Sequence, residues 1–178
     1  MPRRFSDYAW TPRTLKTELI YIFASFVLFV SALTIGWHQG LLWQTFPLLG
    51  TSIALEAQPG AVASIALGFG PLSGGLISIL GNLVLIPILL ISFRQVILHW
   101  HWARRRVQRA RSWADRFAGY GVGVLFVLSP VLGAYVSIAI GYAMGARPLP
   151  TFAATLGGMV ATVALIVYGG HWALRWIP

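Results

Sequence analysis

The sequence contains no cysteine and few charged residues. Without cysteine, disulfide bonds, thiolate metal sites and cysteine nucleophiles are excluded. Only 10% of the 178 residues are charged, whereas a soluble domain carries about 25%. Two long blocks, residues 17–93 and 117–174, are almost entirely apolar. Their ionisable side chains other than tyrosine are Glu18, His38, Glu56, Arg147 and His171. Apolar blocks of this length indicate an integral membrane protein.

Acidic residues are also scarce, with 4 against 13 lysines and arginines. The excess positive charge of +9 gathers before the first apolar run and in residues 94–116, between the two blocks. Basic residues beside membrane spans are retained on the cytoplasmic side. We therefore expect a multi-pass protein of the bacterial cytoplasmic membrane with its N-terminus inside, and no nucleic-acid partner.

The basic residues also limit how the chain can cross the membrane. Residues 19–36 carry no charge and predict a first transmembrane helix. Two further full spans within residues 47–93 would place the arginine-rich segment outside, against the positive-inside rule. We therefore predict that residues 47–70, which are broken by proline and glycine, form a re-entrant hairpin. Only residues 72–93 would then cross.

The second block resembles the first. The pattern of residues 64–68 returns at 137–141, and Pro71-Leu72 returns as Pro148-Leu149. The predicted fold is a single all-α integral membrane domain (19–36 transmembrane helix; 47–99 repeat one, a re-entrant hairpin plus helix; 100–117 basic amphipathic interfacial helix; 119–175 repeat two, a re-entrant hairpin plus helix). With about three transmembrane helices, the two hairpins would be opposed in an inverted repeat, an arrangement typical of transporters.

Glu56 is the acidic residue of the predicted first hairpin. A carboxylate near the bilayer centre costs about 2.5–3.5 kcal/mol on insertion scales, so it is rarely retained without a function. Glu56 could bind a proton or a cation, or orient a cationic substrate, or it could only hold the loop together through hydrogen bonds. Gln58 and Pro59 lie beside it at the predicted tip, where backbone groups are free to contact a ligand.

Four further candidates lie at the tip of the second hairpin and one in the helix after the first. The second tip contributes Ser129, Pro130, Gly133 and Tyr135. Tyr135 could line a pathway or simply pack. Asn82 could hydrogen-bond between helices or line a cavity.

Neither a catalytic nor a metal site is expected. The chain has no Ser/His/Asp arrangement, no paired carboxylates and no glycine-rich phosphate loop. His38, His99, His101 and His171 lie near predicted interfaces without a set of metal-like partners. We therefore predict neither an enzyme nor a cofactor.

The pattern Glu56-x-Gln58, Gly68, Pro71-Leu72, Gly81-Asn82 and Pro87 resembles the small multi-drug export protein family. The segment Pro130-x-x-Gly133-Ala134-Tyr135 resembles the second hairpin of that family. The family is in turn similar to the DedA superfamily, and the resemblance implies a two-hairpin inverted repeat, often dimeric. Gln58 stands where the family has arginine, and Val62 where it has proline.

The leading hypothesis is a transporter or lipid flippase that moves a small or lipid-linked substrate, coupled to a proton or cation. Membrane lipids and a second copy of the chain are the expected partners. The alternative is a non-transporting membrane subunit or assembly factor of a larger complex, which the scarcity of polar residues in both hairpins favours.

Overall fold

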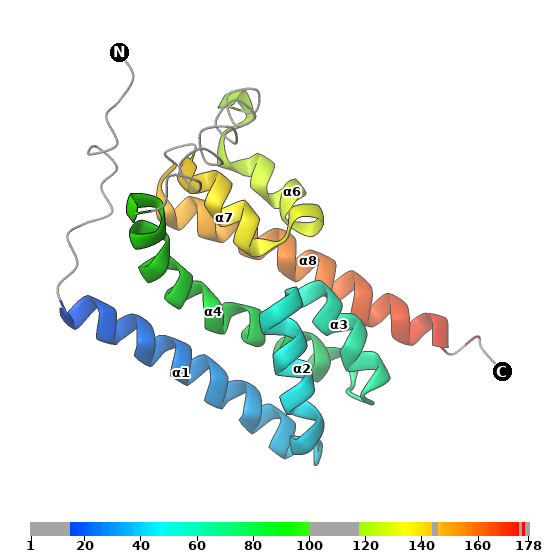
Figure 1. Cartoon of the computed structure of the whole chain (residues 1–178). Helices are drawn as coiled ribbons and strands as arrows, with labels where there is room; N and C mark the ends of the chain where they lie inside the picture. The colour runs from blue at the N-terminus through cyan, green and yellow to red at the C-terminus, as the bar shows by residue number, and fades with distance from the viewer. Residues whose placement is uncertain (1–14, 100–117, 144–145, 175, 177–178) are drawn as a thin grey trace.

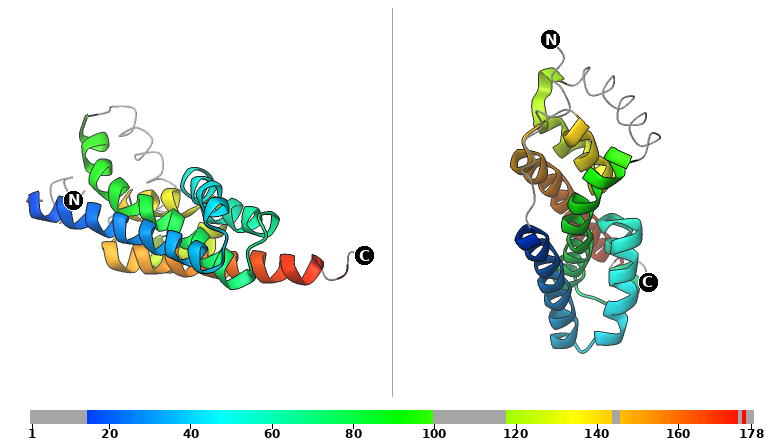
Figure 2. Two further views of the ribbon diagram at one scale, coloured as in Figure 1. Left: turned by 90° about the horizontal axis from the view of Figure 1, so that it is seen from below. Right: turned by 60° about the vertical axis from the view of Figure 1, so that its left-hand side comes forward.

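The computed structural model describes residues 15–99, 118–143, 146–174 and 176, and every long element among them is a helix. Three of these helices are long: α1 (Leu15–His38), α4 (Pro71–His99) and α8 (Pro148–Leu174). Each contains a segment long and apolar enough to cross a membrane. α4 packs against both α1 and α8, and the left view of Figure 2 shows the three helices extended in the same direction. The described residues confirm the predictions of an all-helical fold and of three helices long and apolar enough to span a membrane.

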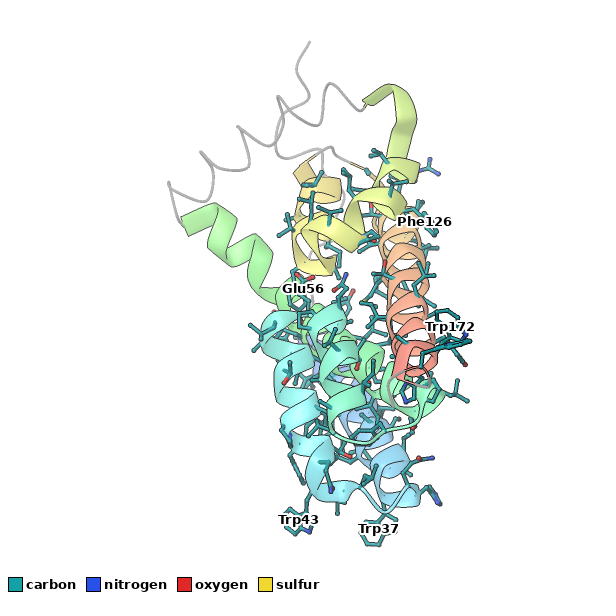
Figure 3. All side chains as sticks on the ribbon, turned by 90° about the vertical axis from the view of Figure 1, so that its right-hand side faces the viewer. Trp37, Trp43, Glu56, Phe126 and Trp172 are labelled. Atoms are coloured by element: carbon teal, nitrogen blue, oxygen red, sulfur yellow. The ribbon has the colours of Figure 1, made fainter. Side chains whose placement is uncertain are left out.

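The outer surfaces of these helices are apolar. Only 17% of the apolar segment of α1 is buried, and Phe23 and Phe26 are exposed on it. On α8, Leu165 is 76% exposed. Trp37 and Trp43 are exposed together at one end of the molecule (Figure 3), as expected for side chains at a membrane interface. These surfaces suit a lipid environment.

Two helical hairpins lie between the long helices. The first consists of α2 (Leu42–Leu55) and α3 (Ala57–Ala66), which pack against each other (Figure 1). The second consists of α6 (Val124–Leu132), which follows the short 3-10 helix η2 (Ala118–Gly123), and α7 (Ala134–Ala143). Figure 3 shows the two hairpins approaching each other from opposite ends of the molecule and meeting near Glu56.

The first hairpin begins at Leu42, five positions before the predicted start at residue 47. The prediction took Pro47 as the start of the hairpin, but Pro47 lies inside α2. Pro130 likewise lies inside α6. The predicted amphipathic helix over residues 100–117 lies outside the described residues.

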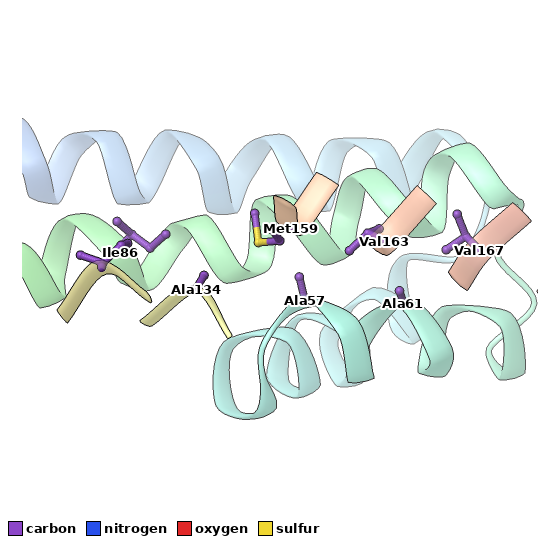
Figure 4. Packing of buried hydrophobic residues seen from close by; sticks show 8 residues of the cluster. Ala57, Ala61, Ile86, Ala134, Met159, Val163 and Val167 are labelled. Carbon is purple, nitrogen blue, oxygen red and sulfur yellow. The ribbon is translucent and has the colours of Figure 1, made fainter. Parts of the chain in front are cut away.

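A cluster of buried apolar residues joins the two hairpins to α4 and α8. It contains Ala57 and Ala61 of α3, Ala134 and Ile138 of α7, Ile86 of α4, and Met159, Val163 and Val167 of α8. Figure 4 shows Ala57 and Ala134, the first residues of α3 and α7, beside Met159. Small residues at these positions let the helix ends approach closely. The tips are therefore held in the middle of the molecule.

Candidate functional site at the hairpin tips

The two hairpin tips have nearly the same backbone. Glu56 connects α2 to α3 with φ 77° and ψ 176°, and Gly133 connects α6 to α7 with φ 85° and ψ 166°. This region of backbone space is essentially restricted to glycine, and another residue held there costs about 1–3 kcal/mol. Among the described residues, Glu56 is the one non-glycine residue with positive φ. The chain therefore keeps a glutamate where the backbone favours glycine.

The Glu56 side chain reaches across to the second hairpin. The Ala134 N–H donates a hydrogen bond of 2.9 Å to Glu56 Oε2. Ala134 is the first residue of α7, so the carboxylate caps the N-terminus of that helix, where backbone N–H groups are unpaired and the helix dipole favours negative charge. A Cβ at Gly133 would collide with the Glu56 carboxyl group, so the glycine at the second tip makes room for the acid of the first.

Two more hydrogen bonds connect the tips. Gln58 Nε2 donates to the Ser129 carbonyl at 3.3 Å. Tyr135 Oη donates to the Ile53 carbonyl at 3.0 Å and lies 3.4 Å from the Asn82 carbonyl. Both carbonyls, of Ser129 and Ile53, belong to the last turn of the helix that leads into each tip. Each hairpin thus pairs with backbone groups at the end of the other, and the Ser129 carbonyl accepts a second hydrogen bond besides that from the Gly133 N–H.

Asn82 lies in α4 beside this junction. Asn82 is 0% exposed, and neither its Nδ2 nor its Oδ1 atom has a hydrogen-bond partner among the described residues. Its neighbour Gly81 packs against Ser52, because a Cβ there would lie 2.9 Å from Ser52 Cβ. An unpartnered buried amide costs about 1–3 kcal/mol per group. The structure therefore gives no support to Asn82 as a hydrogen bond between helices.

The structure brings five of the eight predicted site residues together, and the exceptions are Asn82, whose side chain has no hydrogen-bond partner among the described residues, and two prolines. Glu56, Gln58, Ser129, Gly133 and Tyr135 all take part in the contact between the tips. Pro59 is exposed in the first turn of α3, and Pro130 shapes α6 without contacting the first tip through any hydrogen bond. No group of three or more His, Cys, Asp or Glu residues that could hold a metal ion occurs in the described part of the chain.

Sequence reasoning missed the main-chain groups of this site. The Ala134 amide and the Ile53 carbonyl are as important to the junction as the side chains that meet them. No residue type marks such a group, so only the fold could reveal it.

The family model described as "Putative small multi-drug export protein" matches residues 56–165. The chain belongs to this family. The match begins at Glu56 and ends within α8, so the matched residues include both hairpin tips. Neither a search of curated proteins nor a search of solved structures found a match. Three membrane-length helices and membership of an export family together indicate a transporter-like membrane protein.

Proposed function

We propose that this chain is a membrane transporter in which two opposed re-entrant hairpins close a path between them. The observation that carries the proposal is Glu56, an acid kept in a strained backbone conformation with its carboxylate bound to the other hairpin. Strain of this kind persists only where the surrounding structure enforces it, and it gathers at functional sites. The substrate, a small or lipid-linked molecule, would pass between the tips.

An inverted repeat is supported by a constant spacing of 77 positions between the first unit (α2, α3 and α4) and the second unit (α6, α7 and α8). The tips Glu56 and Gly133 have this spacing. So do Pro71 and Pro148, which begin α4 and α8.

The helix contacts repeat with the same spacing. A Cβ at Gly81 would press against Ser52, and a Cβ at Gly158 would press against Ser129. Both pairs place the serine before a tip against a glycine of the following long helix. The sequence similarity between residues 64–68 and 137–141 has a spacing of 73, so it does not follow this register.

The hydrogen bonds that join the tips directly are few, apart from the apolar cluster that packs both hairpins against α4 and α8. One charge-assisted hydrogen bond contributes about 1.5–3 kcal/mol and each of two neutral bonds about 0.5–1.5 kcal/mol. A ligand with a few kcal/mol of preference for separated tips would shift the equilibrium toward them. Neutralising Glu56 with a proton or a cation would weaken the bond to Ala134 by about half, because charge-assisted bonds are about twice as strong as neutral ones. This geometry supports the proposal that transport is coupled to an ion through Glu56.

Flux measurements with two named probes test the proposal. The protein would be reconstituted into liposomes and tested for scrambling of a fluorescent phospholipid and for efflux of ethidium. We expect the native protein to move one of the two probes and Glu56→Gln to lose that flux. Glu18→Gln changes the other described acid, at the start of α1, and should keep it. Absence of both fluxes, with a stoichiometric protein partner on purification, would instead favour the non-transporting subunit.

A further inference from the structure

At the junction of the tips near Glu56 (Figure 3), α7 donates hydrogen bonds to oxygen atoms of the first unit. The Ala134 N–H donates to the Glu56 carboxylate, and the Tyr135 hydroxyl donates to the Ile53 carbonyl at 3.0 Å. The same hydroxyl lies 3.4 Å from the Asn82 carbonyl oxygen. Three oxygens of the first unit, from α2, the first tip and α4, are thus in contact with two consecutive residues of α7.

The side chain of Asn82 adds a further oxygen at this place in α4. It is fully buried, and its Oδ1 atom has no hydrogen-bond partner among the described residues. The equivalent residue of the second unit, 77 positions later, is Met159, which belongs to the apolar cluster. Gly133 likewise replaces Glu56. The first unit therefore carries a carboxylate, two carbonyls and a free amide oxygen where the second unit has no acid and no amide.

Oxygen ligands with a single negative charge suit a monovalent cation. Hard cations bind carboxylate and carbonyl oxygens, and carbonyls at the C-terminus of a broken helix coordinate Na⁺ in transporters. Ile53 lies in the last turn of α2, where carbonyls lack helical partners and the helix dipole favours positive charge. Glu56 is the one charged residue of the two hairpins, so a divalent cation would keep a buried charge without compensation.

We propose that Ile53, Glu56 and Asn82 form a binding site for a monovalent alkali-metal cation, which takes the place of the two α7 donors when the tips separate. Ala134 and Tyr135 are consecutive, so both donors leave the first unit together. The carboxylate and the Ile53 carbonyl then lose their partners, and a cation satisfies both. Because the cation binds only after α7 has moved away, it favours the separated tips.

The proposal rests on the function proposed above, since it identifies the class of ion coupled to transport, but the site can be tested without measuring transport. Spin labels on cysteines at Leu55 and Leu132, both exposed and each one residue before a tip, report the distance between the tips. The chain has no native cysteine to remove. Distances would be measured in NaCl, KCl or N-methyl-D-glucamine chloride, at one pH and one ionic strength.

We expect Na⁺ or K⁺ to increase the population with separated tips, relative to N-methyl-D-glucamine, which is too large for the site. At about ten times the Kd of the cation, the ratio of separated to closed molecules should rise about tenfold. Identical distance distributions in the three salts would overturn the site.

Two substitutions at equivalent positions of the repeat show whether Asn82 takes part. Asn82→Leu removes the amide oxygen and should abolish the response to the cation. Met159→Leu changes the equivalent buried residue of α8 and should keep it. A response of equal size and equal midpoint in Asn82→Leu would contradict the assignment of Asn82.

The distances and the flux measurements fail separately. Cation-dependent separation of the tips without flux of either probe would support the site and count against transport. Flux in a protein whose tip distance ignores Na⁺ and K⁺ would support transport and overturn the cation site.

Discussion

The strain at Glu56 can be isolated by comparing two substitutions at that position. Glu56→Ala and Glu56→Gly both remove the hydrogen bond to the Ala134 amide, so that loss cancels between them. Alanine keeps the strained backbone, whereas glycine relieves about 1–3 kcal/mol. Glycine also gains about 0.4–1 kcal/mol of freedom in the unfolded chain, which reduces the benefit. The difference between these two ranges is about 0–2.6 kcal/mol, with a midpoint of about 1.3 kcal/mol, so Glu56→Gly should be more stable than Glu56→Ala.

Thermal unfolding in detergent measures this difference. For a chain of this length, 1 kcal/mol shifts Tm by about 2–4 °C, so a difference of about 1.3 kcal/mol should make Glu56→Gly melt roughly 3–5 °C above Glu56→Ala. Ala54 provides a matched control, since it is exposed near the end of α2, two positions before the tip. There Ala54→Gly should lower the stability, by about 1 kcal/mol. If Glu56→Gly melts at or below Glu56→Ala, the strain at this tip is not real.

Two further substitutions test the same junction. Gly133→Ala should lower Tm, because it adds the strain of a side chain at φ 85° and a collision with the Glu56 carboxyl group. The loss of Tm should be smaller in a Glu56→Gly background, where the carboxyl group is absent. Equal losses in both backgrounds would contradict the collision. Asn82→Leu should raise the free energy of unfolding by about 1–3 kcal/mol in the purified protein, since it removes a buried amide without a partner among the described residues. A lower Tm for this variant would mean that the amide does stabilise the fold.

The sequence was sufficient to predict an all-helical fold with three long apolar helices. The length of the uncharged runs predicted these helices. The placement of arginines further predicted that the first hairpin turns back rather than crossing, and this stays a prediction. Both inferences rest on composition over many residues, which tolerates small errors in boundaries. The turn at Glu56 falls within the predicted hairpin for that reason.

The details of the site depended on contacts that no residue type encodes. Asn82 is an example, because an amide in an apolar helix predicts a hydrogen bond across helices, yet the described structure places no partner beside it. The register of the proposed repeat is another, since short apolar patterns such as residues 64–68 recur by chance. His171 was predicted to lie near an interface, and its two hydrogen-bond partners are main-chain carbonyls, which no residue type marks.

The central claim is that the α2–α3 hairpin enters and leaves the membrane on one face, and the second hairpin on the other. Cysteine accessibility tests it directly, with an impermeant thiol reagent applied to intact cells and to inverted vesicles. His38 and Ala66 flank the first hairpin and are exposed; Val122 and Arg147 flank the second, and Arg147 is exposed. Cysteines at 38 and 66 should be labelled only from one face, and those at 122 and 147 only from the other. Labelling of positions 38 and 66 from opposite faces would mean that α2 and α3 together cross the membrane, and the account would be wrong.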